Sequence, residues 1–219
     1  MKSIYLGPEY DLSAIEGDPI TPRQVASLLS FGEKDVDLES GKFYSMQNRK
    51  VIAIFQGRSE AGPRALGNRS ILYDPRDPEA KEKMNALKGR ESFRPFAATV
   101  LQESAKDWFD LAGMEETPSM MYACDALEDT QNIIPGVLHF NTCRIQTLTR
   151  EQNPLYYDVI RAFYKYTKVP MVFNTSFNKA GEPLVETPQD ALDTFYSTDI
   201  KVLYFPEIRR AIVKPFEEP

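Results

Sequence analysis

Short apolar runs alternate with amphipathic stretches along most of this sequence. Residues 51–55, 96–101 and 171–173 are apolar runs of strand length, and each borders glycine, proline or polar residues. That pattern is typical of buried strands. Stripes of apolar residues at helical spacing begin near Pro78 and at Pro154. Both stretches are therefore expected to be amphipathic helices.

The remaining pattern adds further helices and strands without strict alternation. Thr21-Pro22 and Thr187-Pro188 are typical helix starts, because threonine caps a helix and proline fits its first position. A shorter helix is expected at 103–111, with Trp108 and Phe109 buried. Strands are expected at 120–124, 137–140, 144–148, 202–205 and 211–213. The mixture predicts one α/β (α+β) domain with a twisted mixed sheet flanked by helices.

The distribution of turn residues suggests how the chain is divided. Residues 1–20 carry Gly-Pro and Gly-Asp-Pro turns and are interpreted as an N-terminal arm or linker. Residues 21–219 are expected to form the single domain, and residues 33–48 are polar enough to be a surface excursion.

Composition excludes several classes of protein. The 219 residues carry a formal net charge of -6, so nothing global attracts nucleic acid or an anionic membrane. No apolar run approaches the ~20 residues of a membrane span, and the N-terminus lacks the apolar core of a secretory signal. Cys124 and Cys143 have neither metal-type nor disulfide-type spacing, which suits a reducing compartment and predicts a cytoplasmic protein.

A loop rich in glycine and arginine follows the strand expected at 51–55. It contains Gly57, Gly62, Gly67, Pro63 and the arginines Arg58, Arg64 and Arg69. Glycines let backbone N–H groups approach a ligand closely, and guanidinium groups match phosphate or carboxylate oxygens. The loop is therefore a candidate anion site. The alternative is a tight surface turn with solvated arginines.

A second basic cluster consists of Lys88, Arg90 and Arg94, where the helix after Pro78 leads into the strand at 96–101. Lysine and arginine also favour helix C-termini for electrostatic reasons, which is a sufficient explanation for Lys88. Arg94 lies between Phe93 and Pro95, where apolar neighbours predict burial. A buried arginine needs an anion.

Two more polar groups stand at predicted strand ends. His139, the single histidine, rules out a multi-histidine metal site in this chain and is interpreted as a hydrogen-bonded core residue. Arg144 begins an alternating strand and is either an anion ligand or an edge charge. Residues 174–178, Asn-Thr-Ser-Phe-Asn, directly follow an apolar strand, where α/β proteins often bind ligands, although an Asx-type turn also fits.

Together these clusters predict an anion pocket with four candidate cations, Arg64, Lys88, Arg94 and Arg144, and a polar clamp. A Ser–His–Asp set is not apparent. Chemistry run by cations and amides indicates phosphoryl or nucleotidyl transfer, where positioning and charge stabilisation dominate.

Several long motifs occur in the order found in one family. They are G-R-S-E-A-G-P-R-A-L-G-N-R-S-I-L, N-A-L-K-G-R-E-S-F-R-P-F-A, R-I-Q-T, N-T-S-F-N and G-E-P-L-V-E-T-P-Q-D-A-L. From about residue 51 onwards the chain resembles the C-terminal, YrdC-like domain of the O-carbamoyltransferases of nodulation-factor and antibiotic tailoring.

The resemblance implies that the domain binds carbamoyl phosphate and ATP, forms carbamoyl-adenylate and releases pyrophosphate. It implies catalytic roles for Lys88, Arg94 and Ser176. It also implies a set of substrate- and nucleotide-binding residues: Arg64, Arg69, Arg90, Arg144, Asn174, Thr175 and Asn178. Mg²⁺ would arrive with the nucleotide, and no metal ligand is expected in this chain.

Two departures from the family pattern qualify this expectation. The family has H-V-D-G-T-x-R where this chain has His139-Phe140-Asn141-Thr142-Cys143-Arg144, which leaves the placement of Arg144 open. Family members also carry an N-terminal half that resembles actin/Hsp70-like domains, binds iron or another metal through histidines and hosts the acceptor alcohol. That half is absent here, so a separate partner subunit or domain is expected. The alternatives are a non-catalytic nucleotide- or RNA-binding module and a regulatory subunit.

Overall fold

The computed structural model describes residues 4–31 and 49–215. Within these residues, ten strands form one mixed sheet in the order β1-β10-β9-β2-β3-β8-β4-β7-β6-β5. The pairs β2–β9 and β4–β7 are parallel, and the other neighbours are antiparallel. The expected mixed α/β sheet is therefore confirmed. The strands are β1 (Asp18–Pro19), β2 (Ile52–Phe55), β3 (Arg69–Tyr73), β4 (Ala97–Leu101), β5 (Phe109–Asp110), β6 (Tyr122–Ala126), β7 (Thr142–Leu148), β8 (Met171–Ser176), β9 (Val202–Phe205) and β10 (Arg210–Val213).

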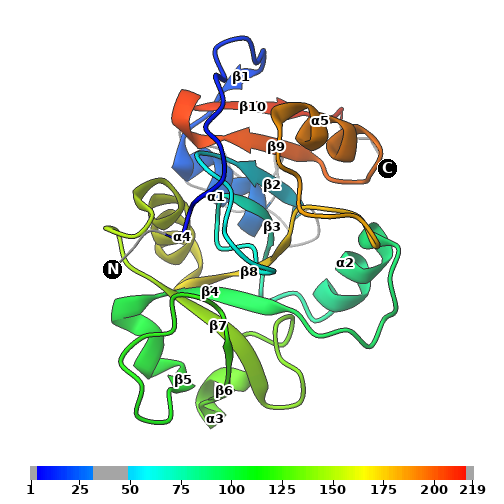
Figure 1. Cartoon of the computed structure of the whole chain (residues 1–219). Helices are drawn as coiled ribbons and strands as arrows, with labels where there is room; N and C mark the ends of the chain where they lie inside the picture. Colours follow the sequence, from blue (N-terminus) through cyan, green and yellow to red (C-terminus); the bar gives the residue numbers. More distant parts are fainter. Residues whose placement is uncertain (1–3, 32–48, 216–219) are drawn as a thin grey trace, which may run out of the picture.

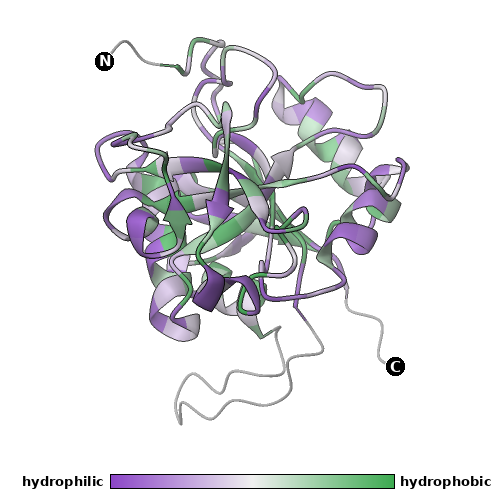
Figure 2. Ribbon diagram, turned by 90° about the horizontal axis from the view of Figure 1, so that it is seen from below, coloured by the Kyte–Doolittle hydropathy of each residue, from purple (hydrophilic) through white to green (hydrophobic). Residues whose placement is uncertain are grey.

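Helices flank this sheet (Figure 1). Helices α1 and α4 pack against each other, α4 also contacts β4 and β8, and α5 packs against β2. Figure 2 shows hydrophobic residues gathered on the central strands and hydrophilic residues on the outer helix surfaces. The helices are α1 (Pro22–Ser30), α2 (Ala80–Lys88), α3 (Glu128–Gln131), α4 (Pro154–Thr167) and α5 (Pro188–Tyr196), with 3-10 turns at Gln102–Asp107 and Pro206–Ile208. None of the helices in the described part of the chain is long and apolar enough to cross a membrane.

The predicted helix starts are confirmed by their caps. The hydroxyl of Thr21 accepts a hydrogen bond from the Gln24 N–H, and the Gln24 side chain accepts from the Thr21 N–H. Thr187 and Asp190 form the same reciprocal capping box at α5. Each cap satisfies N–H groups that have no partner inside the helix, and such a cap typically contributes about 1 kcal/mol.

Several expected elements are wrong. The expected loop at 57–72 ends early, because residues 69–73 form β3 in the middle of the sheet. The expected helix at 103–111 is a 3-10 turn followed by β5. Of Trp108 and Phe109, which were both expected to be buried, Phe109 is fully buried and Trp108 is half-buried. Residues 137–140 form no strand, and His139 is exposed, so its interpretation as a core residue is wrong.

The predicted division of the chain concerns its N-terminal part. Residues 18–19, within the predicted arm, form β1. The predicted excursion at 33–48 lies outside the described residues.

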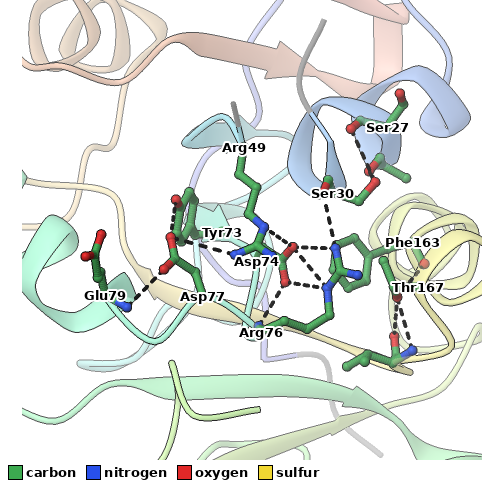
Figure 3. A network of polar contacts seen from close by, with 12 residues as sticks. Ser27, Ser30, Arg49, Tyr73, Asp74, Arg76, Asp77, Glu79, Phe163 and Thr167 are labelled. Carbon is green, nitrogen blue, oxygen red and sulfur yellow. Dashed lines mark hydrogen bonds and ion pairs between the residues drawn. The ribbon is translucent and has the colours of Figure 1, made fainter. Parts of the chain in front are cut away.

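A network of ion pairs anchors the turn after β3 (Figure 3). The buried carboxylate of Asp74 accepts hydrogen bonds from the Arg76 guanidinium at 2.6–3.1 Å and pairs with Arg49 Nε at 2.8 Å. Arg76 also donates to the Ser30 carbonyl at 3.2 Å, which ties the turn to the end of α1. Asp77 accepts from the Tyr73 hydroxyl at 2.7 Å. The network fixes the start of α2, the helix that leads into the cleft described next.

Candidate functional site

A cleft of about 590 Å³ opens beside the C-terminal end of α2. Gly89 caps the helix in the left-handed conformation (φ 65°), a backbone geometry that glycine adopts without strain, and turns the chain along one wall. The end of β8 and the turn after it form the other wall. The lining residues are Lys88, Gly89, Arg90, Glu91, Arg94, Ser176, Asn178, Lys179, Ala180 and Gly181.

Lys88 connects the two walls. Its ammonium donates to the Ser176 carbonyl at 2.6 Å, the Ser176 Oγ at 3.0 Å and the Asn178 Oδ1 at 2.8 Å. Burial, followed by the charge of Arg90, lowers the pKa of Lys88 to about 7. Ser176 Oγ in turn donates to Asn178 Oδ1 at 2.7 Å. The structure thus brings together three of the predicted site residues at one point.

Arg90 is held by a residue that the sequence analysis missed. Its Nε donates to Asn85 Oδ1 at 2.7 Å, and its guanidinium lies 4.2 Å from the centre of the Phe96 ring. Asn85 is buried in α2, and its amide also donates to the carbonyls of Ser92 and Arg94. Asn85 therefore orients both the cation and the loop that follows. The available signal was an asparagine directly beside Met84 of the apolar stripe of this amphipathic helix.

Arg94 lies in the cleft but is not buried. Its side chain is 53% exposed and pairs with Glu91 at 2.8 Å. The neighbouring Phe93 is 74% exposed, so the expected apolar environment of Arg94 was wrong. Proline at position 95 holds the chain extended before β4, and that geometry keeps residues 91–95 at the surface.

Arg64 and Arg144 extend the basic region across the sheet. Arg144 pairs in register with Ala97 of β4, which pairs with Asn174 of β8, so the three side chains leave the same face. Burial, followed by the charge of Arg64, lowers the pKa of Arg144. Burial, followed by Arg94 and Arg144, lowers the pKa of Arg90. These charge effects connect Arg90 with Arg94 and Arg144, and Arg144 with Arg64, so we describe the four arginines together with Lys88 as one cation cluster.

The cluster has few anionic partners. The Nε atoms of Arg64 and Arg144 are buried without a hydrogen-bond partner among the described residues. Within the same residues, the Arg94–Glu91 pair is the one ion pair of the cluster. The arrangement can bind a polyanion, because Lys88 and Arg90 are held in place by neutral partners and only one carboxylate of the described residues pairs with the cluster.

Two of the remaining predicted residues, Asn174 and Thr175, do not line the cleft. The Asn174 amide donates to the Ala65 carbonyl at 3.1 Å and to the Thr99 hydroxyl at 2.9 Å, while its Oδ1 is buried without a partner in the described region. Asn174 therefore fastens the Gly/Arg loop to the sheet. Thr175 alternates to the opposite sheet face and does not join the cluster.

Arg69, which was predicted as a binding residue, makes its contacts inside the fold. It is fully buried, and its guanidinium donates to the carbonyls of Gln56, Asn68, Gly57 and Glu186. It also stacks on Phe55, 3.7 Å from the ring centre. The guanidinium is thus occupied by backbone oxygens, an internal use that the sequence did not distinguish from ligand binding.

Metal binding has no support in the described part of the chain. It contains no group of three or more His, Cys, Asp or Glu side chains that could hold an ion. Cys124 and Cys143 are free and buried.

Comparison with known proteins places this architecture among relatives. The family described as Carbamoyltransferase C-terminus matches residues 44–211. Nodulation protein NolO of Bradyrhizobium diazoefficiens is 42% identical over 203 residues, which cover 91% of this chain and 36% of that protein. Nodulation protein NolNO of Sinorhizobium fredii is 48% identical over 153 residues, which cover 68% of this chain and 22% of that protein. The chain thus spans about a third or less of these curated relatives.

Solved structures share the fold at low sequence identity. The crystal structure of full-length HypF in the phosphate- and nucleotide-bound form has a TM-score of 0.51 and 16% identity, covering 87% of this chain and 24% of that chain. P. abyssi Sua5 complexed with L-threonine has a TM-score of 0.52 and 12% identity, covering 84% of this chain and 46% of that chain. At these identities the likeness concerns the fold.

Proposed function

Because this chain belongs to the family of carbamoyltransferase C-terminal domains, we propose that it binds ATP and carbamoyl phosphate and forms carbamoyl-adenylate. Water removes the phosphate of carbamoyl phosphate to give carbamate and inorganic phosphate. A carbamate oxygen then attacks the α-phosphorus of ATP, and pyrophosphate leaves. The observation that carries the proposal is the cation cluster around the cleft, since these substrates and their products are polyanions.

The residues of the cleft have distinct roles in this proposal. Arg94 is accessible and reaches a phosphate from the rim. Lys88 and Ser176 lie deeper, where a preorganised ammonium and hydroxyl stabilise charge that develops during transfer. Arg90, Arg64 and Arg144 supply further positive charge, and Asn178 keeps Lys88 in place. Mg²⁺ enters with the nucleotide phosphates as part of the substrate.

The proposal is tested by measuring phosphate and pyrophosphate release with ATP, Mg²⁺ and carbamoyl phosphate. Ser176→Ala should lower the rate of pyrophosphate release about 10²-fold while ATP affinity falls much less, because the hydroxyl acts on developing charge. Ser13→Ala is the matched control, because Ser13 is exposed and does not line the cleft. Equal losses of rate and affinity would make Ser176 an ordinary binding residue. ATP binding without pyrophosphate release would instead favour a non-catalytic nucleotide-binding module.

We further propose that the acceptor half of the reaction lies on another chain or domain. The motivation is that the matched region makes up only 36% of NolO, so most of that relative lies outside it. The family resemblance implies an actin/Hsp70-like partner that binds metal and the acceptor alcohol. The cytoplasm, where ATP is available and free cysteines persist, is the proposed compartment. Mass spectrometry of candidate alcohols, with and without such a partner, tests this division. Efficient carbamoylation by this chain alone would contradict it.

A further inference from the structure

Residues 4–7 pair with the Gly/Arg loop, and we call this segment the strap. Tyr5 and Glu60 form an antiparallel bridge. The Ala61 N–H donates to the Ile4 carbonyl at 2.8 Å. In Figure 1 the N-terminal chain, in dark blue, passes beside the cyan loop that follows β2. The strap therefore acts as a short additional strand on residues 58–61.

Contacts at the far end of the strap reinforce this pairing. The Leu6 and Gly7 N–H groups donate to the Ser59 carbonyl at 3.0 and 3.1 Å. The Arg58 guanidinium donates back to the carbonyls of Leu6 and Gly7. A Cβ at Gly7 would collide with the Ser59 hydroxyl, so a glycine is needed for the close approach.

The side chain of Tyr5 reaches across the loop to its second half. Its hydroxyl donates to the Leu66 carbonyl at 2.9 Å and accepts from the Asn153 amide at 3.3 Å. Asn153 also donates to Asn68 Oδ1 at 2.8 Å and caps α4. The Tyr5 ring packs with Leu66 and Met120. Through Tyr5, the strap is joined to the loop residues on both sides of Arg64.

Glu60 completes the connection. Its Oε1 accepts hydrogen bonds from the N–H groups of Leu66 at 2.7 Å, Asn68 at 2.7 Å and Arg69 at 3.1 Å. Burial raises the pKa of the Glu60 carboxyl group, while the backbone N–H donors oppose that shift. The three hydrogen bonds are shielded from water. Glu60 thus joins the two ends of the segment 60–66: its backbone pairs with the strap, and its side chain binds the N–H of Leu66. Arg64 lies within the closed segment.

We propose that Tyr5 and Glu60 are positioning residues, through which the strap sets the place of Arg64 in the anion cluster. The inference rests on the proposed function for the identity of the anions. The route is short: strap backbone, Glu60 carboxylate, loop backbone, Arg64 guanidinium.

A double-mutant cycle tests the route. ATP and carbamoyl phosphate are titrated calorimetrically into the wild-type chain, Tyr5→Phe, Arg64→Ala and the double variant. Tyr5→Phe removes the hydrogen bonds of the hydroxyl to the Leu66 carbonyl and from the Asn153 amide. Leu66 keeps its bond from Gln146 and Asn153 keeps its bond to Asn68, so we expect affinity to fall only roughly three- to tenfold. Tyr5→Phe should lower the affinity for the same ligand, ATP or carbamoyl phosphate, whose binding Arg64→Ala weakens most. In the Arg64→Ala background, Tyr5→Phe should have no further effect, because the two residues act in series.

A merely structural role predicts a different cycle, in which the two losses multiply, and that outcome would overturn the inference. Tyr196→Phe, at an exposed tyrosine on α5, is the control and should leave both affinities unchanged. Unaltered affinities in Tyr5→Phe would overturn the inference as well.

Hydrogen exchange provides a readout that needs no ligand. The amides of residues 64–69 should exchange faster in Tyr5→Phe than in the wild type, while those of α5 stay unchanged. If the wild-type chain binds neither ATP nor carbamoyl phosphate, the proposed function is wrong, and exchange alone decides the role of the strap. Unchanged exchange at Leu66 and Asn68 would then refute it.

Discussion

Two of the three lysines of helix α2, Lys83 and Lys88, are in opposite electrostatic situations. Lys83 is 46% exposed and pairs with Asp77 at 2.8 Å and Glu79 at 3.1 Å. Although partial burial lowers its pKa, the hydrogen bonds to Asp77 and Glu79 outweigh that effect and raise it. Lys88, one and a half turns further on, is 3% exposed, has no carboxylate partner in the described chain and has a lowered pKa.

The same contrast holds for the regions at the two ends of α2. Before the helix, Arg49 and Arg76 share the buried carboxylate of Asp74, and Arg49 also lies 3.9 Å from the carboxylate of Asp77 (Figure 3). After it, Arg90 is held by an amide and an aromatic ring, neither of which carries a charge. Like charges gathered without counter-ions destabilise a fold, so a region that keeps them is a candidate functional site. The first region contains its own counter-ions, whereas in the second the described residues supply a single carboxylate, Glu91.

The largest expected effect comes from breaking the paired region. Asp74→Ala leaves Arg49 and Arg76 without their shared carboxylate at a buried position, which should lower the free energy of unfolding by about 3–5 kcal/mol. Urea denaturation at neutral pH measures it. Glu79→Gln, at a side chain 71% exposed, is the control and should change stability by less than about 0.5 kcal/mol. A loss below about 1 kcal/mol in Asp74→Ala would show that the network is not the anchor inferred here.

Changing the unpaired region should reverse the pattern. Arg94→Ala removes an exposed cation, so the unfolding transition should be unchanged. ATP affinity should fall about 10- to 100-fold, the loss of one charge-assisted hydrogen bond. Arg150→Ala is matched, since Arg150 is similarly exposed and paired with Asp158 at 3.3 Å. Calorimetry on both variants decides, and equal ATP affinities for the two would remove Arg94 from the site.

The charge of Lys88 can be varied by pH alone. The unfolded chain keeps this proton up to the ordinary lysine pKa of 10.5, whereas burial lowers the pKa in the folded chain to about 7. The free energy of unfolding therefore rises with pH between 7 and 10.5 through this group. Anion binding has the opposite sign, because the ammonium is the form that attracts the ligand. ATP affinity should fall above pH 7.5 by at most about tenfold per pH unit.

Lys88→Met should remove the part of the pH dependence of ATP affinity that is due to Lys88. The part that is due to protonation of ATP should remain. Titrations between pH 7.5 and 9 in both proteins measure the difference. Parallel profiles would show that Lys88 does not change charge on binding.

The smallest expected effect is that of a chelator. The carboxylates of the paired region are satisfied by arginines and Lys83, and the described residues hold no metal-type cluster. Prolonged EDTA treatment should therefore leave the unfolding temperature and the Mg²⁺-reconstituted ATP affinity unchanged. Stoichiometric zinc or iron in the purified chain, found by elemental analysis, would contradict this.

The sequence predicted those parts of the fold that follow from local patterns. Pro154 with its apolar stripe gave α4, and Thr187-Pro188 gave α5, because caps and periodicity act within a few residues. Strand β3 was missed since Arg69 and Ser70 look like loop residues, although their polar groups bond inside the sheet. Burial of that kind depends on long-range packing.

The candidate site was predicted unevenly for the same reason. Motifs identified Lys88, Arg90 and Ser176, which the structure brings to one cleft. They could not distinguish Arg69, whose partners are backbone carbonyls distant in sequence, from Arg64. Glu60 and Asn85 were overlooked because a positioning residue shows its role through three-dimensional contacts. A lone carboxylate in a Gly-rich loop was the one local signal for Glu60.

The network around Asp74 also joins two stretches of chain that are distant in sequence. Arg49 and Arg76 both bind the Asp74 carboxylate, Arg76 also donates to the Ser30 carbonyl, and the Lys50 N–H donates to the Leu28 carbonyl at 2.9 Å. The end of α1 and the residues that lead into β2 are therefore fastened to each other and to the turn after β3. These three segments should consequently open as one cooperative unit in the native state rather than fray separately.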